Sequence, residues 1–411
     1  MTTRLAVRRP FWLLTTIGFL SYLAIGTASP FVALYIQQLH GNLADIGLVI
    51  GLGAIAGLLS NIFWGRLTDR SGQRKPFIIG AMAILTITYP LMAHVPIWWL
   101  LMPLIIINGI ASAAYNVCAL AALGDLLNSA GVNDGQRGKW LGSYRTGGSL
   151  AFAIAIIISG FIAQRFGYST LYNIAGLIYI TAFIVACFLP EISVRTRTPS
   201  LIQRHELGAL FHLARGVLSP LILAMLAWNI PFSAVYSIWS IYIVHTLGLG
   251  SSGYARLWGL AAFLEVPSMI IAGRLADRWG RRPMFLLGFF LFTLIYLIYT
   301  ILPFVPTLVI AQMLRGFAYA TFTATALTAV IELAPSEERG RAASVYQLTL
   351  GCAQILGSST GGPLANRVGF HAFFILAAII TIGGAGILLI SDRSPSAITQ
   401  SALPKNRGTL P

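Results

Sequence analysis

Long apolar runs recur along the whole chain, and they constrain the fold more than any other feature of the sequence. Each run has about 20 residues or more, enough for a helix to cross a hydrocarbon layer about 30 Å thick. The runs lie at residues 11–38, 44–64, 77–95, 98–124, 140–163, 169–190, 219–246, 254–273, 284–302, 307–331, 343–364 and 371–391. Backbone polar groups cannot stay unpaired in lipid, so each run is predicted to be a helix. The sequence therefore predicts an all-α polytopic membrane protein with about 12 transmembrane helices.

The charged residues are few and unevenly placed. Only 9% of the 411 residues are charged, against about 25% in a soluble domain. If the N-terminus is cytoplasmic and the runs alternate in direction, most of the 27 lysines and arginines fall in cytoplasmic segments, as the positive-inside rule requires. We therefore assign the net charge of +15 to topology and not to a nucleic-acid partner. The expected location is the cytoplasmic (inner) membrane, with multiple spans and both termini in the cytoplasm.

The longest polar interruption divides the chain into two similar parts. It predicts an N-terminal six-helix bundle at 1–190, a cytoplasmic linker at 191–218 and a C-terminal six-helix bundle at 219–391. Residues 392–411 are polar and contain several Ser and Pro residues, which predicts a disordered cytoplasmic tail.

One short pattern, G-x-[LI]-[AT]-x-R-x-G, occurs four times, beginning at Gly65, Gly160, Gly273 and Gly362. In each half, one copy follows the second helix and one follows the fifth. Each half therefore consists of two three-helix units in opposite orientation. Repeats of this kind form a site at the membrane midplane that opens to each side in turn.

The first and third copies continue into basic loops, GRLTDRSGQRKP at 65–76 and GRLADRWGRRP at 273–283, which we call the gate loops. Both resemble the loop motif of the major facilitator superfamily, and the resemblance covers nearly the whole chain. The matching residues are Gly65, Asp69, Arg70, Gly72 and Arg74 in the first loop and Gly273, Asp277, Arg278 and Gly280 in the second. The resemblance implies the fold of that superfamily, with two pseudo-symmetric six-helix bundles.

The charges of the gate loops are predicted to close the cytoplasmic side. Asp69 is placed to meet the positive N-terminus of a neighbouring helix, and the resemblance implies that this is the eleventh helix. Arg70 is expected to pair with Asp125, at the inner end of the fourth helix. Arg278 is expected to pair with Glu332 in the other half.

The glycines of the first gate loop have their own predicted roles. Gly65 is expected to let two helices approach closely, and Gly72 is expected to allow a tight turn. The alternative is that the whole loop only anchors the topology through its positive charge.

Three charged residues stand out deep inside predicted helices, where a charge costs about 3 kcal/mol or more. Glu265 is interpreted as a substrate hydrogen-bond acceptor or as the carboxylate that carries the coupled proton. The alternative is a static pair with Arg315 that fixes the eighth helix against the tenth. Arg145, which has Gln347 at the equivalent position of the other half, is predicted to offer donors to hydroxyls or to an anionic group.

Polar and aromatic residues at helical spacing predict two faces of a substrate cavity. The seventh helix carries Asn229 and Tyr236, and the fourth carries Asn108 and Tyr115. Amides and aromatic rings suit sugars, which need hydrogen bonds at their hydroxyls and a flat apolar surface. The alternative is that these side chains only join neighbouring helices, as polar residues in membranes often do.

Narrower resemblances point to two groups within the superfamily. Residues 264–284 resemble the eighth helix of bacterial sugar efflux transporters, and residues 144–154 resemble their arginine-containing fifth helix. Proton-coupled multidrug antiporters have an arginine where this chain has Asn108, and a Gly-Pro signature that its fifth helix lacks. The C-terminal half does carry Arg315 and a Gly-Pro pair at 362–363.

The sequence is therefore interpreted as a secondary active transporter that moves small solutes by alternating access. The leading assignment is proton-coupled export of sugars or related amphipathic compounds. A multidrug/proton antiporter is the alternative, and a non-transporting membrane sensor or scaffold is the alternative from another class.

Enzymatic chemistry is not indicated by the sequence. It has no phosphate-binding G-x-x-x-x-G-K-[ST] loop and no histidine spacing typical of a metal site. We expect no enzyme activity, no cofactor and no metal. The expected partners are a small-molecule substrate, protons and the lipid bilayer, without nucleic acid, and the protein is expected to act as a monomer.

Overall fold

The computed structural model of the chain is built from helices. It describes residues 2–129, 132, 134–191, 213–216 and 218–390, and no strand occurs among them. The first group of helices comprises α1 (Thr2–Ala28), α2 (Val32–Gln38), α3 (Leu43–Ser71), α4 (Lys75–Ala93), α5 (Leu101–Ser129), α6 (Asp134–Phe166) and α7 (Tyr168–Cys187). The second group comprises α9 (Ser219–Ile241), α10 (Gly250–Trp279), α11 (Arg281–Ile301), α12 (Val305–Leu333) and α13 (Arg339–Ile390).

The helices match the predicted apolar runs. Within the described residues, 11 helical segments are long and apolar enough to cross a membrane. The longest of them, α13, has 52 residues and is broken at Gly369, where the backbone leaves the helical conformation with φ 77°. It therefore contains the last two predicted spans, so the all-α fold with about 12 transmembrane helices is confirmed.

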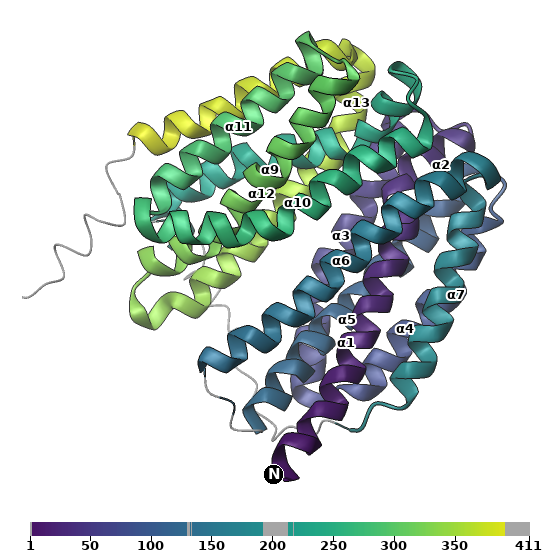
Figure 1. The fold of residues 1–411 in the computed structure, drawn as a ribbon, viewed down its shortest axis with the longest axis vertical. Helices are drawn as coiled ribbons and strands as arrows, with labels where there is room; N and C mark the ends of the chain where they lie inside the picture. The colour runs from purple at the N-terminus through teal and green to yellow at the C-terminus, as the bar shows by residue number, and fades with distance from the viewer. Residues whose placement is uncertain (1, 130–131, 133, 192–212, 217, 391–411) are drawn as a thin grey trace, which may run out of the picture.

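The two groups of helices are in contact toward one end and separate toward the other (Figure 1). The contacts between them are made mainly by α3 with α13 and by α6 with α10. The predicted domain limits stay a prediction, since most of the linker at 191–218 and all of the tail at 392–411 lie outside the described residues.

The groups meet at one end of the molecule, which we call the joined end. A Cβ atom on Gly47 of α3 would lie 3.0 Å from the carbonyl oxygen of Ser359 of α13. A Cβ atom on Gly160 of α6 would lie 2.9 Å from the carbonyl oxygen of Ser251 of α10. The hydroxyls of Tyr168 and Ser251 add a hydrogen bond of 2.8 Å. Small residues thus let the backbones touch across the two groups.

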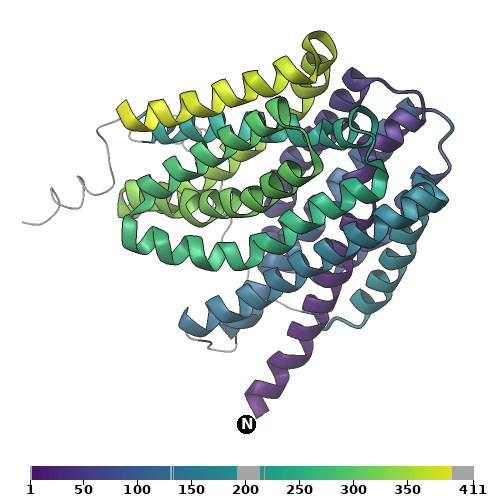
Figure 2. The ribbon, with the colours of Figure 1, turned by 45° about the horizontal axis from the view of Figure 1, so that its top comes forward.

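The groups diverge toward the opposite end, which we call the open end (Figure 2). Both gate loops lie at this end, at the C-termini of α3 and α10. A Cβ atom on Gly65, Gly142, Gly273 or Gly340 would meet no atom within 4 Å. The expectation that Gly65 supports a close helix contact is therefore wrong for this conformation, because no neighbouring helix lies within contact distance of it.

The four sequence repeats mark four turns between helices. The last glycine of each repeat has a positive φ angle, 64° at Gly72, 82° at Gly167, 92° at Gly280 and 77° at Gly369. Glycine adopts this conformation without the steric penalty of a Cβ atom. The tight turn predicted at Gly72 is thus present, and each of the other repeats contains one too.

The duplication of the halves extends to individual hydrogen bonds. The hydroxyl of Tyr35 donates to the carbonyl oxygen of Met92 over 2.8 Å. The hydroxyl of Tyr242 donates to the carbonyl oxygen of Tyr299 over 2.6 Å. Both residues of the second bond lie 207 positions after their counterparts in the first. The two groups therefore share one internal architecture.

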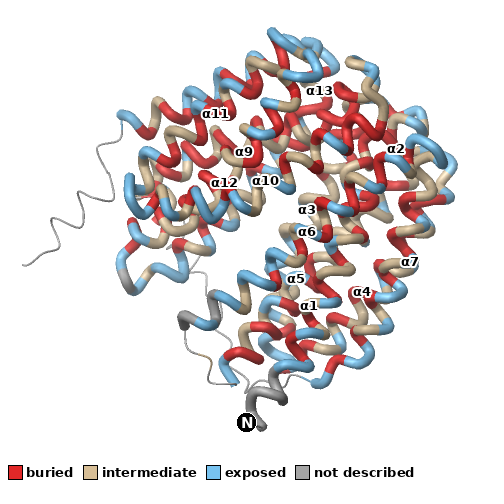
Figure 3. Tube along the Cα trace, in the orientation of Figure 1, coloured by how far each residue is buried: buried red, intermediate tan, exposed pale blue. Residues whose placement is uncertain are grey.

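Large apolar side chains are exposed on the outside of the molecule, among them Leu59, Ile87 and Leu177. Figure 3 shows exposed residues along the outer helices of both groups. Exposed apolar surface of this extent is typical of contact with a membrane. These faces are consistent with lipid as the solvent of the helices.

Candidate functional site

The candidate site is built where α10 and α12 cross. A Cβ atom on Gly316 of α12 would lie 2.8 Å from the carbonyl oxygen of Ala261 and 3.3 Å from the backbone nitrogen of Glu265 on α10. The two backbones are therefore in direct contact at this point. Because Arg315 precedes Gly316, the crossing brings an arginine and a glutamate close together on neighbouring helices.

The guanidinium of Arg315 is held by neutral groups. Its Nε atom donates to Oε1 of Gln312 over 2.8 Å, and one Nη atom donates to the carbonyl oxygen of Trp258 over 3.3 Å. Its central carbon lies 4.6 Å from the ring centre of Trp258 and 4.9 Å from that of Tyr236. Arg315 is only 7% exposed, and cation–π contacts are strongest in such desolvated surroundings, at about 2 kcal/mol.

Arg315 and the residues connected to it by hydrogen bonds and ring contacts are called the Arg315 network: Arg315, Gln312, Tyr299, Tyr236 and Trp258. The amide nitrogen of Gln312 donates to the hydroxyl of Tyr299 over 2.6 Å. The hydroxyls of Tyr299 and Tyr236 are 3.2 Å apart. Three helices, α9, α11 and α12, thus cooperate with α10 to fix one cation.

The carboxylate of Glu265 has no such partner. Among the described residues it makes no hydrogen bond, and no nitrogen of Arg315 lies within 4.0 Å of it. The charges of Glu265 and Arg315 both act on Tyr319 of α12. The predicted alternative of a static Glu265–Arg315 pair is therefore not what the structure shows. The half-buried carboxylate is free to accept a ligand or a proton.

Arg145 and Gln347 lie nearer the open end, on α6 and α13. Both side chains are exposed. The charge of Arg145 acts on Tyr144 of its own helix and on Tyr346 of α13. Arg145 therefore lies close enough to the second group of helices for its charge to act on a residue of that group.

The predicted face of α9 divides into two environments. Tyr236 belongs to the Arg315 network, as described above. The amide of Asn229 donates to the carbonyl oxygen of Met225, one turn earlier on the same helix, over 3.0 Å. The structure therefore connects Tyr236 with the charged site and gives Asn229 a partner within α9.

The predicted face of α5 is bound within the first group of helices. The hydroxyl of Tyr115 lies 3.2 Å from that of Tyr144 on α6. Asn108 accepts a hydrogen bond from Thr88 and donates to the sulfur of Met92, both on α4. These contacts fit the alternative in which polar residues join neighbouring helices.

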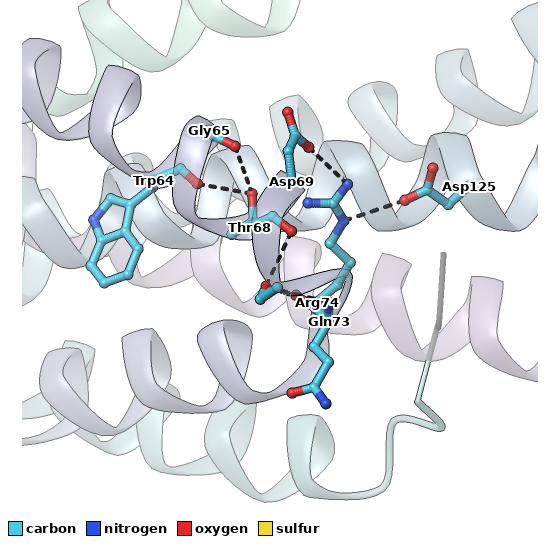
Figure 4. A network of polar contacts seen from close by, with 8 residues as sticks. Trp64, Gly65, Thr68, Asp69, Gln73, Arg74 and Asp125 are labelled. Atoms are coloured by element: carbon cyan, nitrogen blue, oxygen red, sulfur yellow. Dashed lines mark hydrogen bonds and ion pairs between the residues drawn. The ribbon is translucent and has the colours of Figure 1, made fainter. Parts of the chain in front are cut away.

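In the first gate loop, Arg74 is the residue that binds both carboxylates (Figure 4). One Nη atom lies 3.1 Å from Asp69, and Nε lies 3.3 Å from Asp125. The expectation that Arg70 pairs with Asp125 is wrong, since Arg70 is exposed and Arg74 is buried. Asp69 is 61% exposed and binds Arg74, where the resemblance implied the N-terminus of the eleventh helix.

The second gate loop has the same arrangement around Arg281. This arginine lies 2.9 Å from Asp277 and 3.4 Å from Glu332, while Arg278 is exposed. The expected pairing of Arg278 with Glu332 is therefore wrong as well. The first loop has one more residue between its glycine turn and its proline, so the two loops match when they are aligned on Pro76 and Pro283.

Sequence reasoning missed most of the Arg315 network. Gln312 is three residues before Arg315, and Trp258 is seven residues before Glu265. Residues at these spacings share a helix face, so both could have been found around the two charged positions. Tyr299 gave no such signal, because it lies on a different helix.

The chemistry available at this site is that of hydrogen bonds and charge. The described residues contain no group of three or more His, Cys, Asp or Glu side chains that could hold a metal ion. What the site offers is one unpaired carboxylate, two arginines and several tyrosine hydroxyls. These groups suit a small solute that carries hydroxyls or a charge.

Two groups of membrane-spanning helices that join at one end, with a buried arginine and a half-buried glutamate inside the second group, define a multi-pass membrane protein with a transporter architecture. The chain belongs to the MFS_1 like family, whose model matches residues 11–376. The predicted membership of the major facilitator superfamily is thereby confirmed.

Individual relatives and structures agree with this family. The multi-drug resistance efflux pump PmrA of Streptococcus pneumoniae is 26% identical over 374 residues, covering 88% of this chain and 90% of the relative. A Deinococcus radiodurans protein with a provisional name as a sugar efflux transporter is 25% identical over 393 residues, covering 93% and 98%. The crystal structure of the nucleoside transporter NupG superimposes with a TM-score of 0.79 at 15% identity, covering 92% of this chain and 98% of the other. This last likeness confirms the fold.

Proposed function

We propose that this protein is a secondary active transporter of the cytoplasmic membrane that exports sugars or related amphipathic compounds in exchange for protons. The observation that carries the proposal is the unpaired, half-buried carboxylate of Glu265 beside the Arg315 network. Family membership and the provisional name of the Deinococcus radiodurans relative support it.

Glu265 couples the two fluxes because one carboxylate serves two occupants. The ionised carboxylate of Glu265 accepts a hydrogen bond from a substrate hydroxyl. The protonated carboxyl group is a weaker acceptor, so it binds the substrate less tightly. Each occupant thus weakens the binding of the other, which is the coupling free energy that exchange requires. Arg145 and the neighbouring tyrosines supply further hydrogen bonds to the solute.

A multidrug/proton antiporter is the second candidate. The rings of Phe232 and Tyr319 stack with their centres 5.3 Å apart, and both side chains are partly exposed. A lipophilic cation could lie against these rings and pair with Glu265. The name of the Streptococcus pneumoniae relative agrees with this candidate.

Transport into proteoliposomes with an imposed pH gradient separates the candidates. A labelled alkyl glycoside and labelled tetraphenylphosphonium are the two probes. We expect pH-driven movement of the glycoside, and we expect Glu265→Gln to reduce it to background because the variant cannot exchange a proton. The matched control is Glu337→Gln at an exposed position of the short 3-10 helix before α13, which should keep its flux.

Two results would contradict the proposal. Full pH-driven flux in Glu265→Gln would remove the proton role of this residue. Movement of tetraphenylphosphonium alone would favour the second candidate.

We assign the open end to the cytoplasm, and with it both termini, because most cations fall on that side. During transport the two bundles, residues 1–190 and 219–391, rotate relative to each other, so that the site opens to one side of the membrane at a time. One chain holds both bundles and both gate loops, so a monomer suffices. We call the conformation that is open on the other side the exchanged conformation. In it the open end is closed, and the charged residues of the two gate loops meet there: Asp69, Arg74 and Asp125 in one group and Asp277, Arg281 and Glu332 in the other.

The repeats specify which residues meet when the open end closes. Gly65 and Gly362 begin equivalent repeats and are 297 positions apart. At the joined end, a Cβ atom on Gly51 would lie 3.1 Å from Cβ of Ser359. The same spacing makes Ile62 the counterpart of Ser359 and Leu348 the counterpart of Gly51. Ile62 and Leu348 should therefore meet in the exchanged conformation.

Cysteine pairs test this exchange in a variant without the three native cysteines. A disulfide places its Cβ atoms about 3.5–4.5 Å apart, so the first pair needs an outward shift of only a few tenths of an ångström from 3.1 Å. The pair Gly51→Cys/Ser359→Cys should form in the conformation described above, and Ile62→Cys/Leu348→Cys in the exchanged one. Conditions that raise one yield should lower the other. Yields that rise together, or a second pair that never forms, would refute the proposed exchange.

A further inference from the structure

Gln312 lies at the centre of the Arg315 network. Its side chain is fully buried, with 0% exposure. The amide oxygen accepts from Nε of Arg315, and the amide nitrogen donates to Tyr299. The hydroxyl hydrogen of Tyr299 is then free to point toward Tyr236, whose ring lies against Arg315. The network therefore has one hydrogen-bond direction, fixed by the amide of Gln312.

Arg315 has an obvious competing partner in Glu265. The backbone of α12 touches the backbone of α10 at Gly316, next to both residues. From this position the long side chain of Arg315 can turn toward Trp258 or toward the carboxylate. An ion pair in surroundings of low dielectric constant is far stronger than in water. Without other contacts, Arg315 would pair with Glu265.

We propose that Gln312 is a positioning residue that holds Arg315 against Trp258 and Tyr236, and so keeps Glu265 free for a substrate or a proton. The use of Glu265 in coupling rests on the proposed function. The position of Arg315, in contrast, is a property of the Arg315 network and does not depend on the solute.

The other groups around the two charges cannot take over this task. Apart from Glu265, the titratable side chains shown to interact with Arg315 are tyrosines: Tyr236 of α9, Tyr254 of α10, Tyr296 and Tyr299 of α11, and Tyr319 of α12. Tyrosines are neutral near pH 7. Helix α6 packs on α10 and carries Arg145, whose charge acts on Tyr144 and Tyr346. Tyr319 is also affected by two further tyrosines, Tyr346 of α13 and Tyr22 of α1. Within the described part of the chain, Glu265 is thus the one carboxylate among these interactions.

The first half has no glutamine–arginine pair at the positions equivalent to Gln312 and Arg315. The residue 207 positions before Gln312 is Ile105, and the residue 207 positions before Arg315 is Asn108. An apolar side chain there has no cation to hold. The glutamine and the arginine therefore occur together in the half that contains the carboxylate.

Carbodiimide labelling of purified full-length protein tests the proposal without a substrate. Dicyclohexylcarbodiimide reacts with protonated carboxyl groups, and mass spectrometry of the Glu265 peptide gives the extent of labelling at each pH. Gln312→Leu releases Arg315 to pair with ionised Glu265. The pH of half-maximal labelling should therefore move down by about 1 unit or more, as expected for a carboxylate beside a new cationic partner.

The opposite substitution provides the contrast. Gln312→Glu gives Arg315 a fixed anionic partner and adds a negative charge near Glu265, so the pH of half-maximal labelling should move up. A merely structural role for Gln312 would not produce shifts of opposite sign. The matched control, Gln354→Leu at an exposed position of α13, should show no shift.

Three outcomes would overturn the proposal. The first is a shift of the pH of half-maximal labelling in the same direction in both Gln312 variants, and the second is no shift in either. The downward shift of Gln312→Leu could also persist in the double variant Gln312→Leu/Arg315→Met, which has no arginine to release. If Gln312→Leu does not fold, Gln312→Met takes its place with the same expected downward shift, because it removes both hydrogen bonds of the amide and keeps the length of the side chain. A failed flux experiment with Glu265→Gln would leave the labelling result unaffected.

Discussion

The two halves of the molecule share one helix crossing but differ in what surrounds it. In the second half, α12 touches α10 through Gly316, as described above. In the first half, α5 touches α3 through Gly109, where a Cβ atom would lie 2.9 Å from the carbonyl oxygen of Gly53. Gly109 and Gly316 are 207 positions apart. The backbone contact is therefore common to both copies.

The side chains at the two crossings are chemically different. The first half has Asn108, bound to Thr88 and to Met92, and all three are neutral. The second half has Arg315 at the position of Asn108 and Tyr299 at that of Met92. The comparison teaches that glycine preserves the architecture while its neighbours diverge. We infer that the coupling charges belong to the second half, and that the first half mainly contributes packing and Arg145.

The largest effect is expected from making the second crossing resemble the first. Arg315→Asn removes the cation of the Arg315 network and should lower pH-driven flux in proteoliposomes by about tenfold or more, equivalent to about 1.4 kcal/mol. Asn108→Ala removes a side chain whose partners are all within α4, so its flux should stay close to that of the unmodified protein. Equal losses in the two variants, after correction for the amount of inserted protein, would show that the halves share the coupling role.

A smaller effect is expected from the two gate loops. The side chain of Arg74 is 7% exposed and that of Arg281 is 20% exposed. Arg74→Met leaves Asp125 without its buried partner, so it should lower the free energy of unfolding by about 1–3 kcal/mol. Arg281→Met breaks more exposed pairs, which contribute less than about 1 kcal/mol. Thermal unfolding of both variants in one detergent compares them, and a lower Tm for Arg281→Met would reverse the assigned order.

The fold could be predicted largely from local features of the sequence. The apolar runs gave the helices because a chain in lipid must satisfy its backbone within each span. The sequence predicts the tight turn at Gly72, and the structure has a turn at the matching glycine of each other repeat, Gly167, Gly280 and Gly369, since glycine takes positive φ readily. Both signals lie within a few consecutive residues, so neither depends on how the helices pack.

The pairing of charges could not be predicted in the same way. Arg70 and Arg74 both belong to the first gate loop, and only the packing of the helices shows that Arg74 is the one buried against Asp125. The partners of Arg315 lie on three helices besides its own, so their contact depends on packing and rotamers. The absence of a Glu265–Arg315 pair follows from those contacts, and the sequence left this point open.

The uncovered glycines at the open end have a further consequence. Gly65, Gly142 and Gly273 lie within helices and contact nothing that a side chain would disturb. A glycine inside a helix is destabilising by about 0.5–1 kcal/mol relative to alanine, so the three together lower the stability of the folded protein by about 1.5–3 kcal/mol in any conformation that keeps these helices. In the proposed exchanged conformation, the same residues would allow the close contacts that Gly47 and Gly160 allow at the joined end. Alanine at these positions would strengthen the helices and would leave the conformation described here undisturbed, but its Cβ atoms would obstruct the contacts that close the open end in the proposed exchange.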